Sequence, residues 1–280
     1  MNTHIYLNII LCIFIMSFNN LIQAICENNE DTISNSINFI NDTTINGFTP
    51  LIVSICKQYI NITKILLNVD GIDINKCEEK NNSSPLYIAA QIGNIGIVKL
   101  LIENGADINL CNSEGDSPLI IASNLGHFEV AELLISVGAN INHCDHANTN
   151  ALYFASQNGY FDIVELIIKS TPVGLDFNIF NSKTDCNPLM ASSKNGHLQI
   201  VKLLIGAIPV CADVNVYNCY GNTALIMASI TGKFDIVKLL IENGANTNQV
   251  NNNGNNASYY ALKNNHINIA ELLYYSTTTI

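Results

Sequence analysis

Histidine and cysteine are the residues of this sequence whose chemistry could support metal binding or nucleophilic attack. His143, Cys144, Asp145 and His146 are consecutive, and all four side chains belong to types that bind zinc. No second pair of cysteines lies near them, so the cluster is a weak zinc signal. The pattern favours a loop tip over a metal centre.

Several cysteines recur at fixed intervals along the chain. Cys77, Cys111 and Cys144 are separated by 34 and 33 residues, which places them at near-equivalent positions of a repeating structure. A disulfide requires Cα atoms within about 7 Å, which neighbouring repeats do not normally provide. We therefore expect a column of free thiols, suited to a reducing cytosol.

Three histidines also occupy equivalent positions. His127 and His197 each follow a glycine, and His266 follows Asn265 in the same context. Packed helices lie roughly 10 Å apart, so these side chains cannot converge on one metal ion, and we predict that they pack in turns. The sequence also lacks a glycine-rich phosphate loop, a nucleophile elbow and a paired-carboxylate pattern. We expect neither a cofactor nor enzymatic activity.

The elements that position these residues are repeats with a period of 33 to 37 residues. A Ser, Thr or Asn followed by Pro or Ala and then usually Leu marks each repeat, and a regular interval of this kind is typical of repeat architectures. The triplets begin at Thr49, Ser84, Ser117, Asn150, Asn187, Thr223 and Asn256.

The third unit illustrates the local structure that each repeat predicts. Ser117 is placed to accept a hydrogen bond at the start of a helix, and Pro118 suits the first helical position. Gly126 allows the backbone to leave that helix. A second, amphipathic helix is predicted over residues 129–136, with Gly138 at its end. The same pattern predicts that one leucine of each second helix lies in the core: Leu100, Leu133, Leu166, Leu203 and Leu239.

This arrangement resembles the ankyrin repeat over roughly residues 20–275. The resemblance rests on the Ser-Pro-Leu helix start, on Gly126-His127 and Gly196-His197 at the turn, and on exits such as residues 104–109, Asn-Gly-Ala-Asp-Ile-Asn. It implies an all-α solenoid of stacked helix-turn-helix units with extended exit turns. We expect an N-terminal capping partial repeat over 20–41 and seven repeats over 42–280, the last acting as a C-terminal cap.

Residues 1–19 form an apolar segment that the repeats do not explain. Its core suits a signal peptide and is short for a membrane span, and no Lys or Arg precedes it. A signal peptide, a retained anchor or an extra helix packed on the end of the solenoid all remain open. Export followed by action in a reducing cytosol would reconcile this segment with the free thiols, and a cytoplasmic protein is the alternative.

The composition limits the class of partner. The chain has 280 residues, 48% of them hydrophobic, and its net charge is −11, with twelve lysines and no arginine. A nucleic-acid-binding protein needs a basic surface, so we expect no DNA or RNA partner. A membrane would be a partner only if residues 1–19 are retained, and we expect a monomer because a capped solenoid need not associate.

The resemblance implies a protein partner that docks on the exit-turn tips and on the exposed side of the first helices. Tyr220 is the preferred anchor, supported by Tyr217, because an exposed aromatic residue offers a large contact area at small entropic cost. The implied binding residues are Glu114, Asp116, Asn124, Leu125, His146, Gln157, Asn158, Lys183, Lys194, Asn195, Tyr217, Tyr220, Asn222 and Ile230.

The predicted function is that of a protein–protein interaction module, either an adaptor or a secreted effector. A membrane-tethered structural scaffold and the substrate-recognition subunit of a larger complex are the alternatives. None of these roles requires a cofactor, since rigid shape and polar complementarity supply the binding.

Overall fold

The computed structural model describes residues 20–25, 27, 40–44, 47–170, 174–207 and 211–278. Contacts divide the chain into two compact units: unit 1 comprises residues 1–122 with 137–139, and unit 2 comprises residues 123–136 with 140–280. The apolar segment 1–19 and most of the predicted partial repeat 20–41 lie outside the described residues. A helix over residues 20–25 begins the described part.

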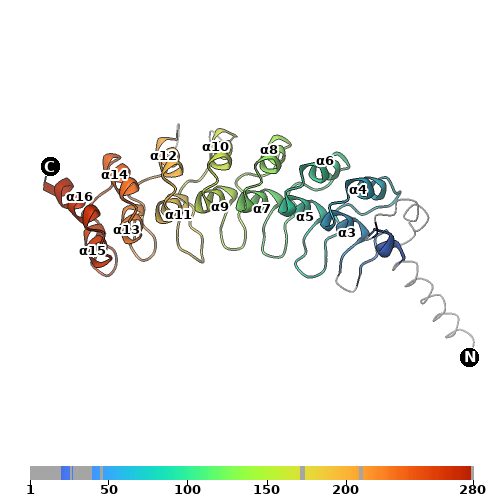
Figure 1. The fold of residues 1–280 in the computed structure, drawn as a ribbon, viewed down its shortest axis with the longest axis horizontal. Coiled ribbons are helices and arrows are strands. Elements are labelled where there is room, and N and C mark those ends of the chain that lie inside the picture. The colour runs from blue at the N-terminus through green and yellow to red at the C-terminus, as the bar shows by residue number, and fades with distance from the viewer. Residues whose placement is uncertain are drawn as a thin grey trace, which may run out of the picture. The chain divides into compact units, whose positions relative to one another are not determined.

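Seven pairs of short helices follow, each pair matching one predicted repeat (Figure 1). The first helices are α3 (Pro50–Cys56), α5 (Pro85–Ile92), α7 (Pro118–Leu125), α9 (Ala151–Asn158), α11 (Pro188–Asn195), α13 (Ala224–Ile230) and α15 (Ala257–Lys263). The second helices are α4 (Ile60–Leu67), α6 (Ile95–Glu103), α8 (Phe128–Ser136), α10 (Phe161–Ser170), α12 (Leu198–Gly206), α14 (Phe234–Glu242) and α16 (Ile267–Thr278).

Each first helix begins at the residue that the sequence predicts. The Asn187 side chain, for example, accepts a hydrogen bond from the Met190 N–H at 2.9 Å, and the Ser117 hydroxyl accepts one from Ile120 at 3.3 Å. Such a cap satisfies one of the amides that the first turn leaves without a helical partner. Gly196 ends α11 with φ at 91°, a left-handed conformation that favours glycine.

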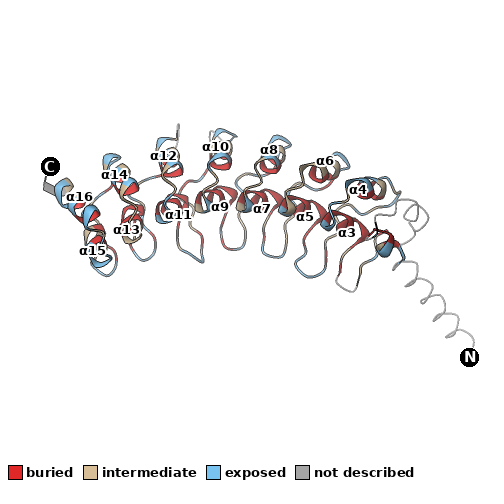
Figure 2. Cartoon of the chain, viewed as in Figure 1, coloured by how far each residue is buried: buried red, intermediate tan, exposed pale blue. Residues whose placement is uncertain are grey.

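Helices of the same kind stack in register within each unit. In unit 1, α3 packs against α5 and α4 against α6. In unit 2, α9, α11, α13 and α15 pack in sequence, and so do α8, α10, α12, α14 and α16 (Figure 1). The first helices up to α13 are buried on most of their surface, whereas α15 is more exposed, and the second helices bury one face and expose the other (Figure 2). The predicted all-α class of stacked helix pairs is confirmed.

The prediction of which leucines form the core is wrong by one position. Leu100 is half-buried, whereas Ile97, Val98 and Leu101 are fully buried. At about 100° per residue, these three side chains share one face of α6 and Leu100 lies to its side. The other predicted leucines, Leu133, Leu166, Leu203 and Leu239, are half-buried in the same way. The following residue is the fully buried one in each helix: Leu134, Ile167, Leu204 and Leu240.

A small residue occupies the sixth position of several first helices, where neighbouring helices approach each other. Ala90 has this position in α5, and Ser156, Ser193 and Ser229 have it in unit 2, all with fully buried side chains. The hydroxyls of Ser156 and Ser193 have no hydrogen-bond partner. Ser229 differs from them, because its hydroxyl donates to the Leu225 carbonyl at 2.8 Å. A small residue is common at this position but not required, since the sixth residue of α3 is the fully buried Ile55.

After each second helix from α4 to α14, the chain makes a turn that a side-chain hydrogen bond to the backbone closes. The Asp73 carboxylate accepts from the Asn75 N–H at 3.1 Å, and Asp213 accepts from Asn215 at 2.8 Å. Equivalent turns form at Asp107, Asn140, Asp176 and Asn246. These turns direct the chain into an extended loop whose tip lies before the next first helix. Among the described helices, none combines the length and the apolar character that crossing a membrane requires.

Candidate protein-binding surface

One buried or half-buried polar side chain closes the tip of each of six extended loops. The Asn218 Oδ1 atom accepts hydrogen bonds from the backbone N–H groups of Tyr220 at 3.1 Å and Asn222 at 2.9 Å. The same role falls to Glu78, Asn112, Asp145, Asn181 and Asn251. Because one residue fixes the tip backbone, the other tip side chains are free to vary without changing its shape.

Sequence reasoning did not identify this row of tip-closing residues. The available signal is an Asn, Asp or Glu five or six residues before the helix-starting Ser, Thr or Asn. Asn218, for example, precedes Thr223 by five residues, and Asn181 precedes Asn187 by six. Short polar side chains of this kind commonly bond to their own backbone two residues further along the chain. They are structural residues that support the candidate surface.

Hydrogen bonds also connect successive tips. In unit 2, the Ser182 N–H donates to the Ala147 carbonyl at 2.8 Å, and the Asn252 N–H donates to the Tyr220 carbonyl at 3.0 Å. The Cys219 N–H donates to the Asp185 carboxylate at 2.7 Å. The tips are therefore held in a defined order before any partner arrives, which lowers the entropic cost of binding.

The predicted tip residues differ in how far they reach into solvent. Glu114, His146 and Lys183 are exposed, whereas Asp116 and Asn222 are half-buried. The Asp116 carboxylate also influences a tyrosine of unit 1. Burial, together with the negative charge of Asp116, raises the pKa of Tyr87 to about 12. Asp116 thus contributes to the local structure of the tip as well as to its surface.

Two tyrosines project from one tip of unit 2. Tyr217 is 61% exposed and Tyr220 is 62% exposed, although the backbone of each is fixed. Tyr217 pairs with Thr223 in an isolated antiparallel bridge, and Tyr220 donates its N–H to Asn218. Val250 occupies the position equivalent to Tyr217 in the next repeat and is 48% exposed. Sequence reasoning missed Val250, which the repeat interval of 33 residues from Tyr217 could have indicated.

The predicted first-helix residues form two rows with different roles. In the row of Asn124, Gln157, Lys194 and Ile230, Lys194 is exposed and the others are half-buried. In the neighbouring row, the Asn158 amide donates to the Asn124 carbonyl at 2.9 Å and the Asn195 amide donates to the Gln157 carbonyl at 2.7 Å. These two asparagines join successive repeats, while Leu125 in the same row is an exposed apolar side chain.

Two of the three turn histidines, His197 and His266, pack between repeats, as predicted. The His197 Nε2 atom lies 3.0 Å from the Gln157 carbonyl oxygen, and His266 Nε2 lies 3.3 Å from that of Ile230. The His197 ring covers Gly159, where an added Cβ atom would lie 2.6 Å from the ring. The glycine is therefore required both for its left-handed backbone and for this close approach.

The residues of the candidate zinc cluster take part in loop structure. Asp145 closes its tip by accepting from Ala147 and Thr149, and the Cys144 thiol donates to the Asn142 carbonyl at 3.5 Å. Across the part of the chain that the structure describes, no three His, Cys, Asp or Glu side chains group in a way that could hold a metal ion.

The predicted column of equivalent thiols is confirmed. Cys77 and Cys111 donate to the carbonyl oxygens of Asn75 and Asn109 at 3.4 Å and 3.2 Å, in the same geometry as Cys144. The seven cysteines in the described ranges are free. Burial is the main factor that raises the pKa of Cys77, Cys111 and Cys144, so these thiols are poor nucleophiles at neutral pH.

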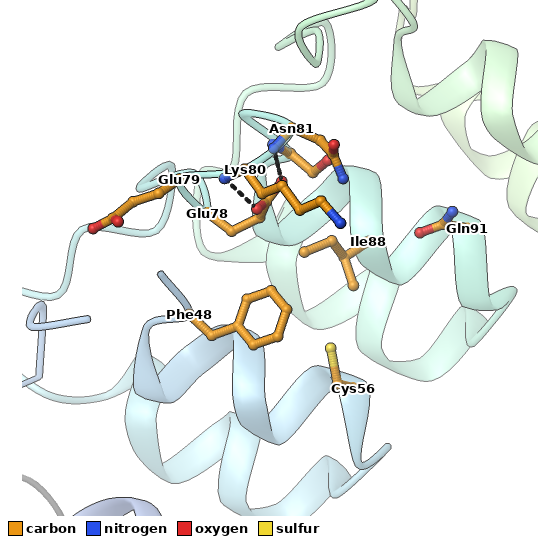
Figure 3. Close-up of a pocket in the computed structure, with 9 residues that line it drawn as sticks. Phe48, Cys56, Glu78, Glu79, Lys80, Asn81, Ile88 and Gln91 are labelled. Carbon is orange, nitrogen blue, oxygen red and sulfur yellow. Dashed lines mark hydrogen bonds between the residues drawn. The ribbon is translucent and has the colours of Figure 1, made fainter. Parts of the chain in front are cut away.

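Unit 1 carries a recess of about 660 Å³ beside its loops (Figure 3). Phe48 and Ile88 supply its apolar part, and Lys80, Asn81 and Gln91 stand around it (Figure 3). Sequence reasoning did not identify it, because its lining comes from two repeats and from side chains that match no motif.

The tip beside this recess is closed by a carboxylate. Glu78 accepts from the N–H groups of Lys80 and Asn81, each at 2.7 Å, and from Ser83 at 3.1 Å (Figure 3). Burial alone would raise the pKa of Glu78, but the N–H groups of Ser83, Lys80 and Asn81 outweigh burial and hold it below its ordinary value.

Comparison with known proteins identifies the repeats. The family model described as ankyrin repeats (3 copies) matches residues 11–112, 86–181, 131–209, 173–251 and 189–280. The chain is 43% identical over 51 residues to the human histone-lysine N-methyltransferase EHMT1, a match that covers 18% of this chain and 4% of that protein.

Two further relatives are a toxin and a fem-1 homolog. Delta-latroinsectotoxin-Lt1a of Latrodectus tredecimguttatus is 47% identical over 51 residues, which is 18% of this chain and 4% of the toxin. The protein fem-1 homolog CG6966 of Drosophila melanogaster is 32% identical over 72 residues, 23% of this chain and 11% of that protein. The chain thus spans only a small fraction of each of these relatives, and the shared part is repeat sequence. Since the family matches together extend over residues 11–280, the chain belongs to the ankyrin-repeat family, whose repeats are generic protein–protein interaction modules.

Proposed function

We propose that this protein is an adaptor or effector that binds a partner protein through the tyrosine surface of unit 2. We define the tyrosine surface as Tyr217, Tyr220 and Val250 together with the lysines Lys183 and Lys194. The observation that carries the proposal is the exposure of both tyrosines, above 60% each, on a tip whose backbone is already fixed.

Fixed aromatic side chains are efficient binding anchors. A tyrosine combines a large apolar area with a hydroxyl group and has only two rotatable side-chain bonds to order on binding. Trp, Tyr and Arg are the residue types that contribute most often to binding energy at protein interfaces. This sequence contains neither Trp nor Arg. Exposed tyrosines on a rigid tip are therefore the strongest anchors that this chain can offer.

The charges around the tyrosines favour a particular kind of partner. Lys183 and Lys194 are exposed in the repeat before the tyrosines, and the Asp185 carboxylate between them bonds to the backbone of the tyrosine tip. We propose a partner segment with an apolar or aromatic side chain for the tyrosines and a carboxylate for the lysines. Such charge pairs mainly add specificity and speed of association.

The proposed mode of action is binding without catalysis. The ankyrin fold is typically a non-catalytic module, and the free thiols of the described residues suit a reducing compartment. Whether the protein reaches that compartment by export depends on residues 1–19, and the choice between adaptor and exported effector follows from their processing.

Site-specific photo-crosslinking tests the proposal. A photoreactive phenylalanine analogue replaces Tyr220 in one protein and Tyr275 in a matched control, since both tyrosines are exposed in unit 2. We expect one or a few proteins to be crosslinked from position 220 and absent from position 275. Identical sets of crosslinked proteins from both positions would contradict a binding role for the tyrosine surface.

A further inference from the structure

Hydrogen bonds join the successive repeats of unit 2 in two uninterrupted rows. The turn row lies at the ends of the first helices, where the Asn195 amide donates to the Gln157 carbonyl at 2.7 Å. The equivalent donors at the other pairs of first helices are Asn158, Thr231 and Asn264. The tip row joins the loop tips, as the Ser182 N–H joins the Ala147 carbonyl at 2.8 Å. The first helices are therefore held at both of their ends.

A third row, which we call the exit row, joins the turns that follow the second helices. In unit 1, the Asn75 Oδ1 atom accepts from the Asp107 N–H at 2.9 Å. In unit 2, the Asn215 Oδ1 atom accepts from the Asn246 N–H at 2.8 Å, and the Asn215 amide donates to the Gly244 carbonyl at 3.1 Å. One asparagine thus fixes each exit to the next, and with it the ends of two neighbouring second helices.

The exit row is interrupted on both sides of the exit that follows α10. Among the described residues of unit 2, the Asn142 side chain makes no such bond to Asp176, and Asn178 makes none to Asp213. The Asn178 Oδ1 atom is buried and has no hydrogen-bond partner. The exit of α10 is therefore joined to neither neighbour by the exit row, although the turn row and the tip row continue past it.

The length of the repeats explains where the exit row is interrupted. The intact bonds join residues that are 31 or 32 positions apart in the sequence. Asp176 follows Asn142 by 34 positions, and Asp213 follows Asn178 by 35. The additional residues change the path by which the chain reaches these two exits, so the backbone N–H no longer meets the asparagine of the preceding repeat.

The interruption favours movement of α10 relative to α8 and α12, the helices on either side of it (Figure 1). Apolar packing holds α10 against both of them, and such packing is not directional. A buried acceptor without a partner destabilises the arrangement that contains it. Displacement of α10 lets water reach the Asn178 Oδ1 atom, which removes part of that cost. The neighbouring first helix α9 stays in place, because the turn row and the tip row hold it.

We propose that unit 2 contains a built-in bending point at α10. The first helices act as the fixed side of the bend, and the second helices separate or approach at the exit of α10. Small shifts of packed helices against one another are a common form of conformational change. The bend alters the angle between the α8 side and the α12 side of unit 2, so the same surface fits partners of different curvature. It does not depend on the tyrosine surface being the binding site.

Distance distributions between spin labels in the full 280-residue protein test this proposal. The labels are attached to a ketone-bearing amino acid, which leaves the native cysteines unmodified. One pair replaces Glu132 of α8 and Lys202 of α12, which lie on either side of α10, and the control pair replaces Lys202 and Glu271 of α16. All three residues are exposed and occupy the fifth position of their helices. We expect the distribution for 132 and 202 to be about twofold wider than the control.

Two asparagine variants provide a matched comparison. Asn215→Ala removes an intact bond of the exit row and should widen the distribution for 202 and 271. Asn178→Ala removes a side chain that makes no such bond and should leave the distribution for 132 and 202 unchanged.

Equal widths for the two pairs of labels in the unsubstituted protein would overturn the proposal. A control distribution that Asn215→Ala leaves unchanged, or a distribution for 132 and 202 that Asn178→Ala widens, would also overturn it. Circular dichroism verifies that each labelled protein is folded. If labels at the fifth positions disturb folding, the exposed second residues of the same helices take their place: Glu129, Gln199 and Asn268. Tyr217→Ala/Tyr220→Ala should leave both distributions unchanged, so failure of the bend and failure of the tyrosine surface are distinguishable.

Discussion

The recess of unit 1 and the tyrosine surface of unit 2 are built on the same loop scaffold but offer a partner opposite shapes. In unit 1, Phe48 and Ile88 lie in a hollow beside a tip closed by the Glu78 carboxylate. In unit 2, Tyr217 and Tyr220 project from a tip closed by the Asn218 amide. Because one closing residue fixes each tip, neighbouring positions can create either a hollow or a projection without altering the fold.

The largest effect should come from the core that both regions share. Leu101→Ala in unit 1 and Leu240→Ala in unit 2 remove fully buried side chains, and each should lower the free energy of unfolding by about 2–5 kcal/mol. The half-buried neighbours provide matched controls: Leu100→Ala and Leu239→Ala should cost clearly less. Urea unfolding followed by circular dichroism measures all four variants. Equal losses within each pair would show that the buried stripe has been assigned incorrectly.

Local features of each repeat could be predicted from the sequence, whereas the choice of core leucine could not. The repeat interval, the caps such as Ser117 and Asn187 and the turn role of His197 follow from local rules, and the structure confirms them. The choice between Leu100 and Leu101 depends on the direction from which the partner helix arrives, which an amphipathic pattern gives only to within about one residue.

The candidate surface was less predictable for a related reason. Exposure of Tyr220 could be anticipated, because a tip residue has few neighbours in any repeat. The recess of unit 1 arises between two repeats, so no single repeat contains its pattern. The amide of Asn195 bonds to the preceding repeat at 2.7 Å, a contact that the sequence of its own repeat does not reveal.

The two tip-closing residues should differ in their contribution to stability. Glu78→Ala leaves three backbone N–H groups without their charged acceptor and should lower the free energy of unfolding by about 2–3 kcal/mol. Asn218→Ala removes a neutral acceptor from two N–H groups and should cost about 1–2 kcal/mol. Urea unfolding again provides the measurement. A larger loss for Asn218→Ala would contradict the importance of the charge at Glu78.

The same pair should respond differently to acid. The folded pKa of Glu78 lies below its ordinary value of 4.5, so its stabilising contribution is complete above that value and is lost as the pH falls through the folded pKa. Hydrogen exchange should therefore show the amides of Lys80 and Asn81 losing protection in this acidic range. The amides of Tyr220 and Asn222 should keep theirs, since the Asn218 side chain does not titrate. Equal loss at both tips would refute the assignment.

The smallest effect concerns two buried serines and should differ in sign between the units. Ser54 in unit 1 donates to the Leu51 carbonyl at 2.8 Å and lies 3.0 Å from the Thr63 hydroxyl, so Ser54→Ala should cost about 1 kcal/mol. The buried Ser156 hydroxyl in unit 2 has no partner, and Ser156→Ala should be neutral or stabilising by up to about 1 kcal/mol. Thermal unfolding of the two variants compares them, and destabilisation by Ser156→Ala would contradict the prediction.

The most direct test of the account is the affinity of the protein crosslinked from position 220, measured by isothermal titration calorimetry. Tyr217→Ala/Tyr220→Ala should weaken binding about 100-fold or more, as expected for the loss of two anchors. Lys80→Ala/Gln91→Ala, which alters exposed side chains of the unit 1 recess, should leave the affinity within about threefold. Strong weakening by the recess variant together with unchanged binding by the tyrosine variant would contradict the account and place the partner on unit 1.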